Sequence, residues 1–202
     1  MPVQEFGGKH PRIDSTVFVA SNATIIGDVE IGSGGSVWPN AVIRGDSQAI
    51  RIGKKVSVQD NVVIHSPSNT PVIIGDRVTI GHSAILHGCK IGDDALIGMG
   101  SIILDGARIG DCVLVGAGAL VTPDSVIPSK SLVLGVPGKV IRQLNDEEMD
   151  RMKANVEEYV NLARQYKEAK REEPSSLIIT TTKKFRLELT LFLTSLQKFS
   201  TI

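Results

Sequence analysis

The sequence predicts a mainly β protein, in which short parallel strands wind into a three-sided prism, followed by one C-terminal α-helix. Three observations support this prediction. Aliphatic residues recur every six positions over most of the chain, 20 of the 202 residues are glycine, and aromatic residues make up only 4%. A core with so few rings must be built from Val, Ile, Leu and Ala, and the glycines suit tight corners between short strands.

The six-residue period runs through four blocks of the chain. Strand side chains alternate between two faces, so the first and fifth residues of each unit point the same way, and we expect both to face the core. Three units make a coil of about eighteen residues with three flat sides and three corners, and stacked coils bury one aliphatic column per corner. The aliphatic positions are Ile13, Val19, Ile25, Ile31, Val37, Ile43, Ile52, Val58, Ile64, Ile74, Ile80, Leu86, Ile91, Ile97, Ile103, Ile109, Val115, Val121, Ile127 and Val133.

The period is interrupted at three places. The spacing lengthens to nine residues after Ile43 and to ten after Ile64, and it shortens to five after Leu86. Insertions into a repeat protein form loops on one face, which is often the functional face. Histidines lie in the second and third interruptions, so these are the first places to look for a site.

The repeats end at a turn, and the chain changes character twice after it. We expect residues 1–140 to form the prism domain, residues 141–174 a helix that packs on it, and residues 175–202 a tail without assigned structure. Asn145 is the predicted N-cap of the helix, with Glu148 as its capping-box partner. One apolar stripe at three- and four-residue spacing should pack the helix against the prism or a neighbouring subunit. It consists of Met149, Met152, Val156, Tyr159, Ala163 and Tyr166.

The composition excludes several classes of partner. The chain has 22 basic and 22 acidic residues, so it lacks the broad positive field typical of proteins that bind nucleic acid or anionic membranes. It has no run of about 18 apolar residues, the length needed to span a membrane. With only Cys89 and Cys112, and an N-terminus without a signal-peptide pattern, we expect a reducing, cytoplasmic setting.

Three histidines, His65, His82 and His87, indicate a metal site. His82 follows His65 by seventeen residues, nearly one coil, which predicts that these two lie at almost the same angle on adjacent coils and that His87 lies on a different face. Outer faces of one prism do not meet, but those of neighbouring prisms do in a cyclic trimer. Three neutral imidazoles with an open fourth position make up a catalytic zinc site. The alternative is three unrelated histidines on the strand surfaces.

Five short motifs follow one another along the chain: Arg44-Gly45-Asp46, Val58-Gln59-Asp60-Asn61, Ile64-His65, Ile80-Gly81-His82 and Leu86-His87-Gly88-Cys89. Together with the repeats, which extend over roughly residues 11–140, they resemble the γ-class carbonic anhydrases, a family of left-handed parallel β-helices within the hexapeptide-repeat superfamily. The left-handed sense of the coils is implied by this resemblance.

The resemblance implies a metal, a substrate and an assembly. His65 and His87 of one subunit and His82 of the next would bind zinc, with iron or cobalt as alternatives. The protein would be a homotrimer whose substrate is carbon dioxide and whose product is bicarbonate, with no nucleic-acid or membrane partner.

The resemblance also implies roles for residues around the metal. Arg44, Asp46 and Asp60 would form an ion-pair network across the subunit boundary, or serve only to hold the trimer together. Gln59 would orient the attacking hydroxide and the carbon dioxide. The segment Tyr159-Val160-Asn161 of the C-terminal helix would bring Tyr159 and Asn161 to the site.

One departure from the family pattern leaves alternatives open. No glutamate occurs between Glu30 and Glu147, and Ser47 and Ser68 stand where the best-characterised branch carries acidic residues that export protons. We therefore expect slow hydration, or a metal-binding protein without catalysis. The segment Gly135-Val136-Pro137-Gly138-Lys139 resembles a loop near the coenzyme A site of transferases with this fold, so an acyl- or acetyltransferase is the other alternative.

Overall fold

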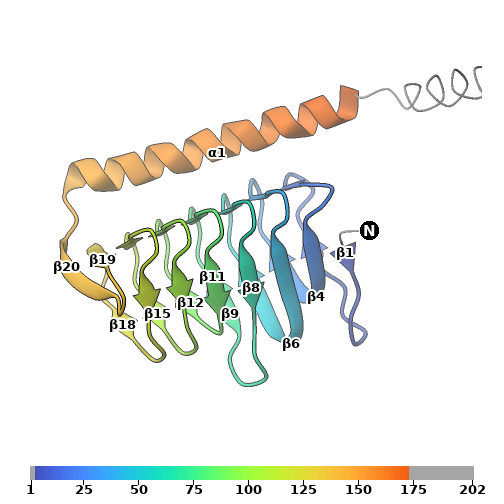
Figure 1. Cartoon of the computed structure of the whole chain (residues 1–202). Coiled ribbons are helices and arrows are strands. Elements are labelled where there is room, and N and C mark those ends of the chain that lie inside the picture. Colours follow the sequence, from blue (N-terminus) through green and yellow to red (C-terminus); the bar gives the residue numbers. More distant parts are fainter. Residues whose placement is uncertain (1–2, 173–202) are drawn as a thin grey trace, which may run out of the picture. The chain divides into compact units, whose positions relative to one another are not determined.

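The fold is a parallel β-solenoid of about 7 turns with one C-terminal helix (Figure 1). It is seen in a computed structural model that describes residues 3–172, so the tail at 175–202 lies outside the described residues. One sheet has 12 strands and the other 8, and the named strands pair in parallel except for β19 with β20. The predicted fold class, mainly β with a C-terminal helix, is confirmed.

The twelve-stranded sheet covers two sides of the prism, because β4 (Thr24–Ile31) and β6 (Val42–Ile52) each continue from one side to the next. The first face contains their first halves with β1 (Val3–Gln4), β8 (Val63–His65), β11 (Ile85–His87), β14 (Ile102–Ile103) and β17 (Leu120–Val121). The second face contains their second halves with β2 (Arg12–Ile13), β9 (Val72–Ile74), β12 (Lys90–Ile91), β15 (Arg108–Ile109) and β18 (Val126–Ile127).

The eight-stranded sheet forms the third face. Its strands are β3 (Phe18–Val19), β5 (Ser36–Val37), β7 (Ser57–Val58), β10 (Thr79–Ile80), β13 (Leu96–Ile97), β16 (Leu114–Val115), β19 (Ser131–Leu134) and β20 (Lys139–Gln143). The chain then enters helix α1 (Asp146–Glu172).

The core lies inside the prism and consists of columns of aliphatic side chains. On the first face, Ile43, Ile64 and Leu86 are in register on successive coils, and each is 0% exposed. This stacking follows from the six-residue period, because equivalent residues of successive coils pair across the sheet. The alternation of strand side chains then turns the next residue of each strand outward.

One corner of the prism differs from the glycine-rich corners that the composition predicts. Between the second and third faces the left-handed backbone is adopted by residues with long or polar side chains, among them Lys55 (φ 54°), Arg77 (φ 57°) and Asp94 (φ 57°). Backbone hydrogen bonds to the previous coil hold them there: the N–H of Arg77 donates to Lys54 O at 2.8 Å, and that of Asp94 donates to Asp76 O at 2.9 Å. Inter-coil pairing therefore outweighs the preference for glycine at these positions.

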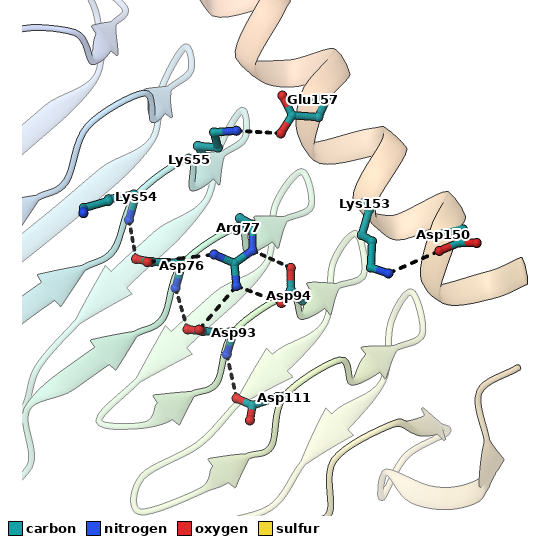
Figure 2. Close-up of polar contacts among 10 residues, drawn as sticks. All are labelled: Lys54, Lys55, Asp76, Arg77, Asp93, Asp94, Asp111, Asp150, Lys153 and Glu157. Atoms are coloured by element: carbon teal, nitrogen blue, oxygen red, sulfur yellow. Dashed lines mark hydrogen bonds and ion pairs between the residues drawn. The ribbon is translucent and has the colours of Figure 1, made fainter. Parts of the chain in front are cut away.

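Three aspartates at this corner form what we call the aspartate ladder, Asp76, Asp93 and Asp111. Figure 2 shows each carboxylate accepting a backbone N–H from the preceding coil: Lys54 N at 2.7 Å, Asp76 N at 2.8 Å and Asp93 N at 2.8 Å. The guanidinium of Arg77 lies beside two of these carboxylates, 3.4 Å from Asp93 and 4.0 Å from Asp76, and pairs with Asp94 at 2.7 Å. The ladder thus satisfies backbone donors that the corner leaves without a strand partner.

Helix α1 begins at the predicted capping box. Asn145 Oδ1 accepts the N–H of Glu148 at 2.9 Å, and Glu148 Oε2 accepts the N–H of Asn145 at 3.0 Å. The part of the helix up to Arg164 lies against the third face, where Asn155 accepts a hydrogen bond from Thr79 at 3.0 Å. Among the described residues, no helix combines the length and the apolarity that a membrane span requires.

The apolar stripe of the helix differs in part from the predicted one. Tyr166 is 50% exposed in the single chain, and because the stripe was expected to pack on the prism or on a neighbouring subunit, its place in the stripe stays a prediction. Val160 is 5% exposed and belongs to the stripe. Val160 was overlooked because the predicted stripe took Tyr159 at this turn, and both residues face the prism there. The buried residues are Met152, Val156, Val160 and Ala163.

Candidate metal site on the first face

Two of the predicted ligands, His65 and His87, end neighbouring strands of the first face and lie in register. Nδ1 of His65 is 3.0 Å from Nε2 of His87, and the ring centroids are 5.0 Å apart. Each histidine follows a fully buried residue, Ile64 or Leu86, so the alternation of the strand turns both imidazoles outward. The two rings therefore form a pair on the outer surface of the prism.

His82 lies elsewhere, and the seventeen-residue spacing predicted the wrong pair. It follows β10 on the third face, and its Nδ1 is 2.8 Å from Oδ2 of Asp60. The loop after β8 lengthens its coil, so the partners in register, His65 and His87, are separated by 22 residues. The family resemblance also groups His65 with His87, and the place of His82 in an assembly stays a prediction.

The other ring nitrogen of each histidine contacts an aspartate carboxylate. Nε2 of His65 is 3.1 Å from Oδ1 of Asp46, and Nδ1 of His87 contacts Oδ1 of Asp105. An ionised carboxylate only accepts hydrogen bonds, so each neutral imidazole carries its proton on the nitrogen that faces the carboxylate. Nδ1 of His65 and Nε2 of His87 then direct their lone pairs toward each other. Two such lone pairs 3.0 Å apart repel each other, and a cation between them would relieve that repulsion.

This donor set fits a divalent metal ion. Two nitrogens bound to zinc at 2.0–2.1 Å in tetrahedral geometry lie about 3.3 Å apart, close to the 3.0 Å between the two ring nitrogens. Histidines that bind metals commonly donate their other N–H to a carboxylate, as His65 and His87 do here. A catalytic zinc needs a third protein ligand, and within residues 3–172 no group of three metal-binding side chains occurs in the single chain.

Arg44 and Asp46 form an ion pair beside this histidine pair. Burial raises the pKa of Asp46, but hydrogen bonds from Arg44 and His65 outweigh it and hold the pKa below its usual value. The carboxylate is therefore ionised at neutral pH and accepts the His65 proton. Arg44 also lies in register with His65, so these groups follow one line along the face.

A second cluster contains the other predicted residues of the site. The buried Gln59 accepts the backbone N–H of His82 at 3.1 Å and hydrogen-bonds Tyr159 through its side chain. Tyr159 packs edge-on against Trp38, with ring centroids 5.9 Å apart, and burial raises the pKa of its hydroxyl. Asp60, beside Gln59, pairs with the His82 ring. The helix thus brings Tyr159 to Gln59, which binds the His82 backbone, and not to the His65 pair of its own chain.

Asn161 lies on the exposed side of α1, where its side chain accepts a hydrogen bond from Arg164 at 3.4 Å. Its role at a site between subunits stays a prediction. Asp105 was missed at the sequence level. It follows His87 by eighteen residues, one regular coil, and that spacing was the signal that could have identified it.

Comparisons with known proteins agree with the fold and the motifs. The family model described as bacterial transferase hexapeptide (six repeats) matches residues 88–123. A probable carbonic anhydrase of Methanocaldococcus jannaschii is 54% identical over 151 residues, which cover 75% of this chain and 95% of the relative. Gamma carbonic anhydrase 2, mitochondrial, of Arabidopsis thaliana is 43% identical over 161 residues and 77% of this chain, which spans only 58% of that relative's length.

A solved structure has the same fold along nearly its whole length. It is a Bacillus cereus protein provisionally described as an acetyltransferase, with a TM-score of 0.82 and 46% sequence identity. The match covers 83% of this chain and 97% of that one. The sequence relatives and this structural neighbour therefore carry names from two different enzyme classes.

Proposed function

The chain belongs to the γ-class carbonic anhydrase family, and from this premise we propose that it reversibly hydrates carbon dioxide to bicarbonate at metal sites between the subunits of a homotrimer. The observation that carries the proposal is the pair of ring nitrogens of His65 and His87, 3.0 Å apart, with a carboxylate behind each ring. The free thiols Cys89 and Cys112 suit the proposed cytoplasmic location.

We propose that the third ligand is His82 of a neighbouring subunit. His82 lies at the far side of a corner from the His65 pair, so two copies packed side by side can bring the three rings together. Its backbone N–H is bound by Gln59, which hydrogen-bonds Tyr159. A subunit that contributes His82 therefore contributes Gln59 and Tyr159 to the same site.

The first face carries an apolar column that suits such a contact. Five outward-facing aliphatic residues follow one another in register beside the histidines. Val63 is 38% exposed and Ile85 39% exposed, and contiguous exposed apolar surface of this kind is typical of interaction sites. A trimer would bury it against a second copy of this chain. The five residues are Val42, Val63, Ile85, Ile102 and Leu120.

The chemistry divides between the metal and the chain. His65 and His87 would hold a zinc, iron or cobalt ion, which would supply a nucleophile at neutral pH by acidifying water. Asp46 would keep the His65 proton on the nitrogen away from the ion. The oxygen of Gln59 accepts the His82 N–H and its side chain also hydrogen-bonds Tyr159, so a remaining amide N–H would be the donor that orients an oxygen of carbon dioxide or bicarbonate.

Proton export is expected to limit turnover. The two carboxylates beside the histidine pair, Asp46 and Asp105, are engaged by imidazoles, and no glutamate lies between Glu30 and Glu147. The released proton must then pass directly to buffer. We expect kcat to rise with buffer concentration, while kcat/KM, which reports the hydration step, does not.

The test is stopped-flow hydration of carbon dioxide by protein of known zinc, iron or cobalt content, in small and bulky buffers. The matched control is His65→Ala, which loses one ligand and leaves the core untouched. Metal-loaded protein should hydrate at least about 100-fold faster than the control, because removing a ligand costs more than the 10–100-fold typical of its supporting groups. Equal rates would overturn the catalytic proposal and favour the metal-binding alternative.

An acyl- or acetyltransferase is the second candidate function. It is supported by the likeness to the Bacillus cereus structure and by the segment 135–139, which ends the repeats. Calorimetry with acetyl-coenzyme A separates the two functions. Saturable binding by protein free of zinc, iron and cobalt, unaffected by His65→Ala, would favour the transferase.

A further inference from the structure

We propose that Asp105 is a positioning residue for His87: it accepts the Nδ1 proton of that imidazole and thereby presents Nε2 to the metal as a lone pair. The proposal rests on the proposed function for the presence of a metal. The hydrogen bond between Asp105 and His87, however, forms within one chain and needs no metal. It adds a residue that no motif of the sequence indicated.

Asp105 lies in the turn that follows β14, one coil after His87, where the first face meets the second. Its Oδ1 contacts Nδ1 of His87. The turn is fixed to the coil below by the N–H of Gly106, which donates to the carbonyl of Gly88 at 2.8 Å. Gly106 directly follows Asp105, and Gly88 directly follows His87. This backbone hydrogen bond between the two coils therefore fixes the backbone positions from which the carboxylate and the imidazole extend.

Gly88 makes room for this contact. A Cβ at this position would lie 2.7 Å from Oδ1 of Asp105 and 3.0 Å from Cγ of Pro67, and the backbone there has φ +53°. The close contacts therefore favour glycine at this position, whereas the left-handed backbone alone does not exclude other residues in this fold. The carboxylate reaches His87 across the position where any other residue would place its side chain.

The next coil supplies a matched comparison. Asp124 lies in the corresponding turn one coil later, at the position in register with Gly106 rather than with Asp105, and its carboxylate lies over Gly106 as that of Asp105 lies over Gly88. Its backbone N–H donates to the carbonyl of Asp105 at 2.8 Å. The coil before that turn has Leu104 in register with His87, and its side chain has no group for a carboxylate to orient. Asp124 is therefore an aspartate over a corner glycine without an imidazole beside it, and it controls for the loss of a turn carboxylate.

The physical consequence concerns the position of one proton. A neutral imidazole carries its proton on either nitrogen, and the form protonated at Nε2 cannot bind a metal through that atom. A carboxylate at Nδ1 selects the other form and makes Nε2 more basic. Removing such a partner typically lowers metal affinity 10–100-fold.

The first measurement is the tautomer of His87, read from ¹⁵N shifts and two-bond couplings of metal-free protein labelled on histidine. The full-length wild type is compared with Asp105→Ala, Asp105→Asn and the control Asp124→Ala. We expect the wild type and Asp124→Ala to carry the proton on Nδ1, and Asp105→Ala to shift it toward Nε2. Asp105→Asn keeps a neutral hydrogen-bond acceptor, so its His87 tautomer populations should lie between those of the wild type and Asp105→Ala. This variant provides the test if Asp105→Ala does not fold.

The second measurement is zinc affinity, by competition with a chromogenic chelator. Asp105→Ala should bind zinc 10–100-fold more weakly than the wild type, and Asp124→Ala within about twofold of it. An unchanged His87 tautomer in Asp105→Ala and Asp105→Asn overturns the positioning role, even if the wild type binds zinc and hydrates carbon dioxide. If the tautomer responds but the wild type binds no metal, the positioning role stands and the proposed function fails.

Discussion

The aspartate ladder and the first face place the same side chain at nearly the same spacing for different purposes. Asp93 of the ladder turns its carboxylate to the backbone N–H of Asp76, seventeen residues before it, at 2.8 Å. Asp105 of the first face turns its carboxylate to the imidazole of His87, eighteen residues before it. The neighbouring coil decides the role: where it offers a backbone donor the aspartate caps the coil, and where it offers an imidazole the aspartate orients it.

The largest effect tests the functional side of this comparison. His65→Ala should lower bound metal and kcat/KM for hydration more than about 100-fold, because it removes a ligand whose supporting groups alone are typically worth 10–100-fold. The fold should persist, since the ring points outward from a buried strand. Metal analysis, hydration kinetics and circular dichroism check this, with the exposed His10→Ala as control. Full metal retention would show that the site is misassigned.

The next effect separates the first face from the second. Ile85 and Ile73 are equally exposed, 39% and 40%, but Ile85 lies in the apolar column, and Ile73 lies between Arg51 and Lys90 on the second face. Ile85→Glu should convert the proposed trimer to monomers, because a charge would have to be buried without a partner. Ile73→Glu should leave the proposed trimer intact.

Sedimentation velocity distinguishes these outcomes, and metal content should follow the assembly if His82 comes from a neighbour. Dissociation by Ile73→Glu, with Ile85→Glu still trimeric, would move the subunit contact to the second face. A monomeric wild type would remove the basis for a shared site.

Much of the fold was predictable because one physical regularity repeats along the chain. The six-residue period places Ile64 and Leu86 in the core, and strand alternation then turns the residue after each of them outward. The pairing of the histidines was not predictable from their spacing. The loop between β8 and β9 changes the length of one coil, and a simple count of residues then matched His82 with the wrong partner.

Two further features depend on contacts between coils, which no local pattern records. Lys55 and Arg77 adopt left-handed backbone at a corner where propensity favours glycine, because hydrogen bonds to neighbouring coils hold them. Asp105 resembles any other turn aspartate until the register of β11 with β14 brings it to His87. Residue type and period predict the coils, and register decides which side chains meet.

A smaller effect tests the structural side of the comparison. Asp93→Ala removes the acceptor for the N–H of Asp76 and a carboxylate near Arg77, so it should lower the free energy of unfolding by about 1 kcal/mol. Zinc affinity should not change. Urea denaturation at fixed protein concentration measures the first quantity and chelator competition the second. A loss of zinc affinity would contradict the separation of the two sets of aspartates.

The smallest expected effect concerns Glu148, a carboxylate outside the prism that accepts a backbone N–H as the ladder aspartates do. The hydrogen bond from Arg142, with that from the backbone N–H of Asn145, lowers the pKa of Glu148 from 4.5 to about 2. The folded state therefore binds this proton less readily than the unfolded state, and the stabilisation is fully present above pH 4.5 and is lost as the pH falls toward 2. Glu148→Gln should flatten the dependence of unfolding free energy on pH across this window, and Glu147→Gln, on the same turn but paired only with Arg151, should leave the slope as in the wild type. Equal slopes of unfolding free energy against pH for the wild type and Glu148→Gln would mean that Glu148 does not cap the helix in solution. A capping carboxylate would then need the stacked coils that surround the aspartate ladder to hold it in place.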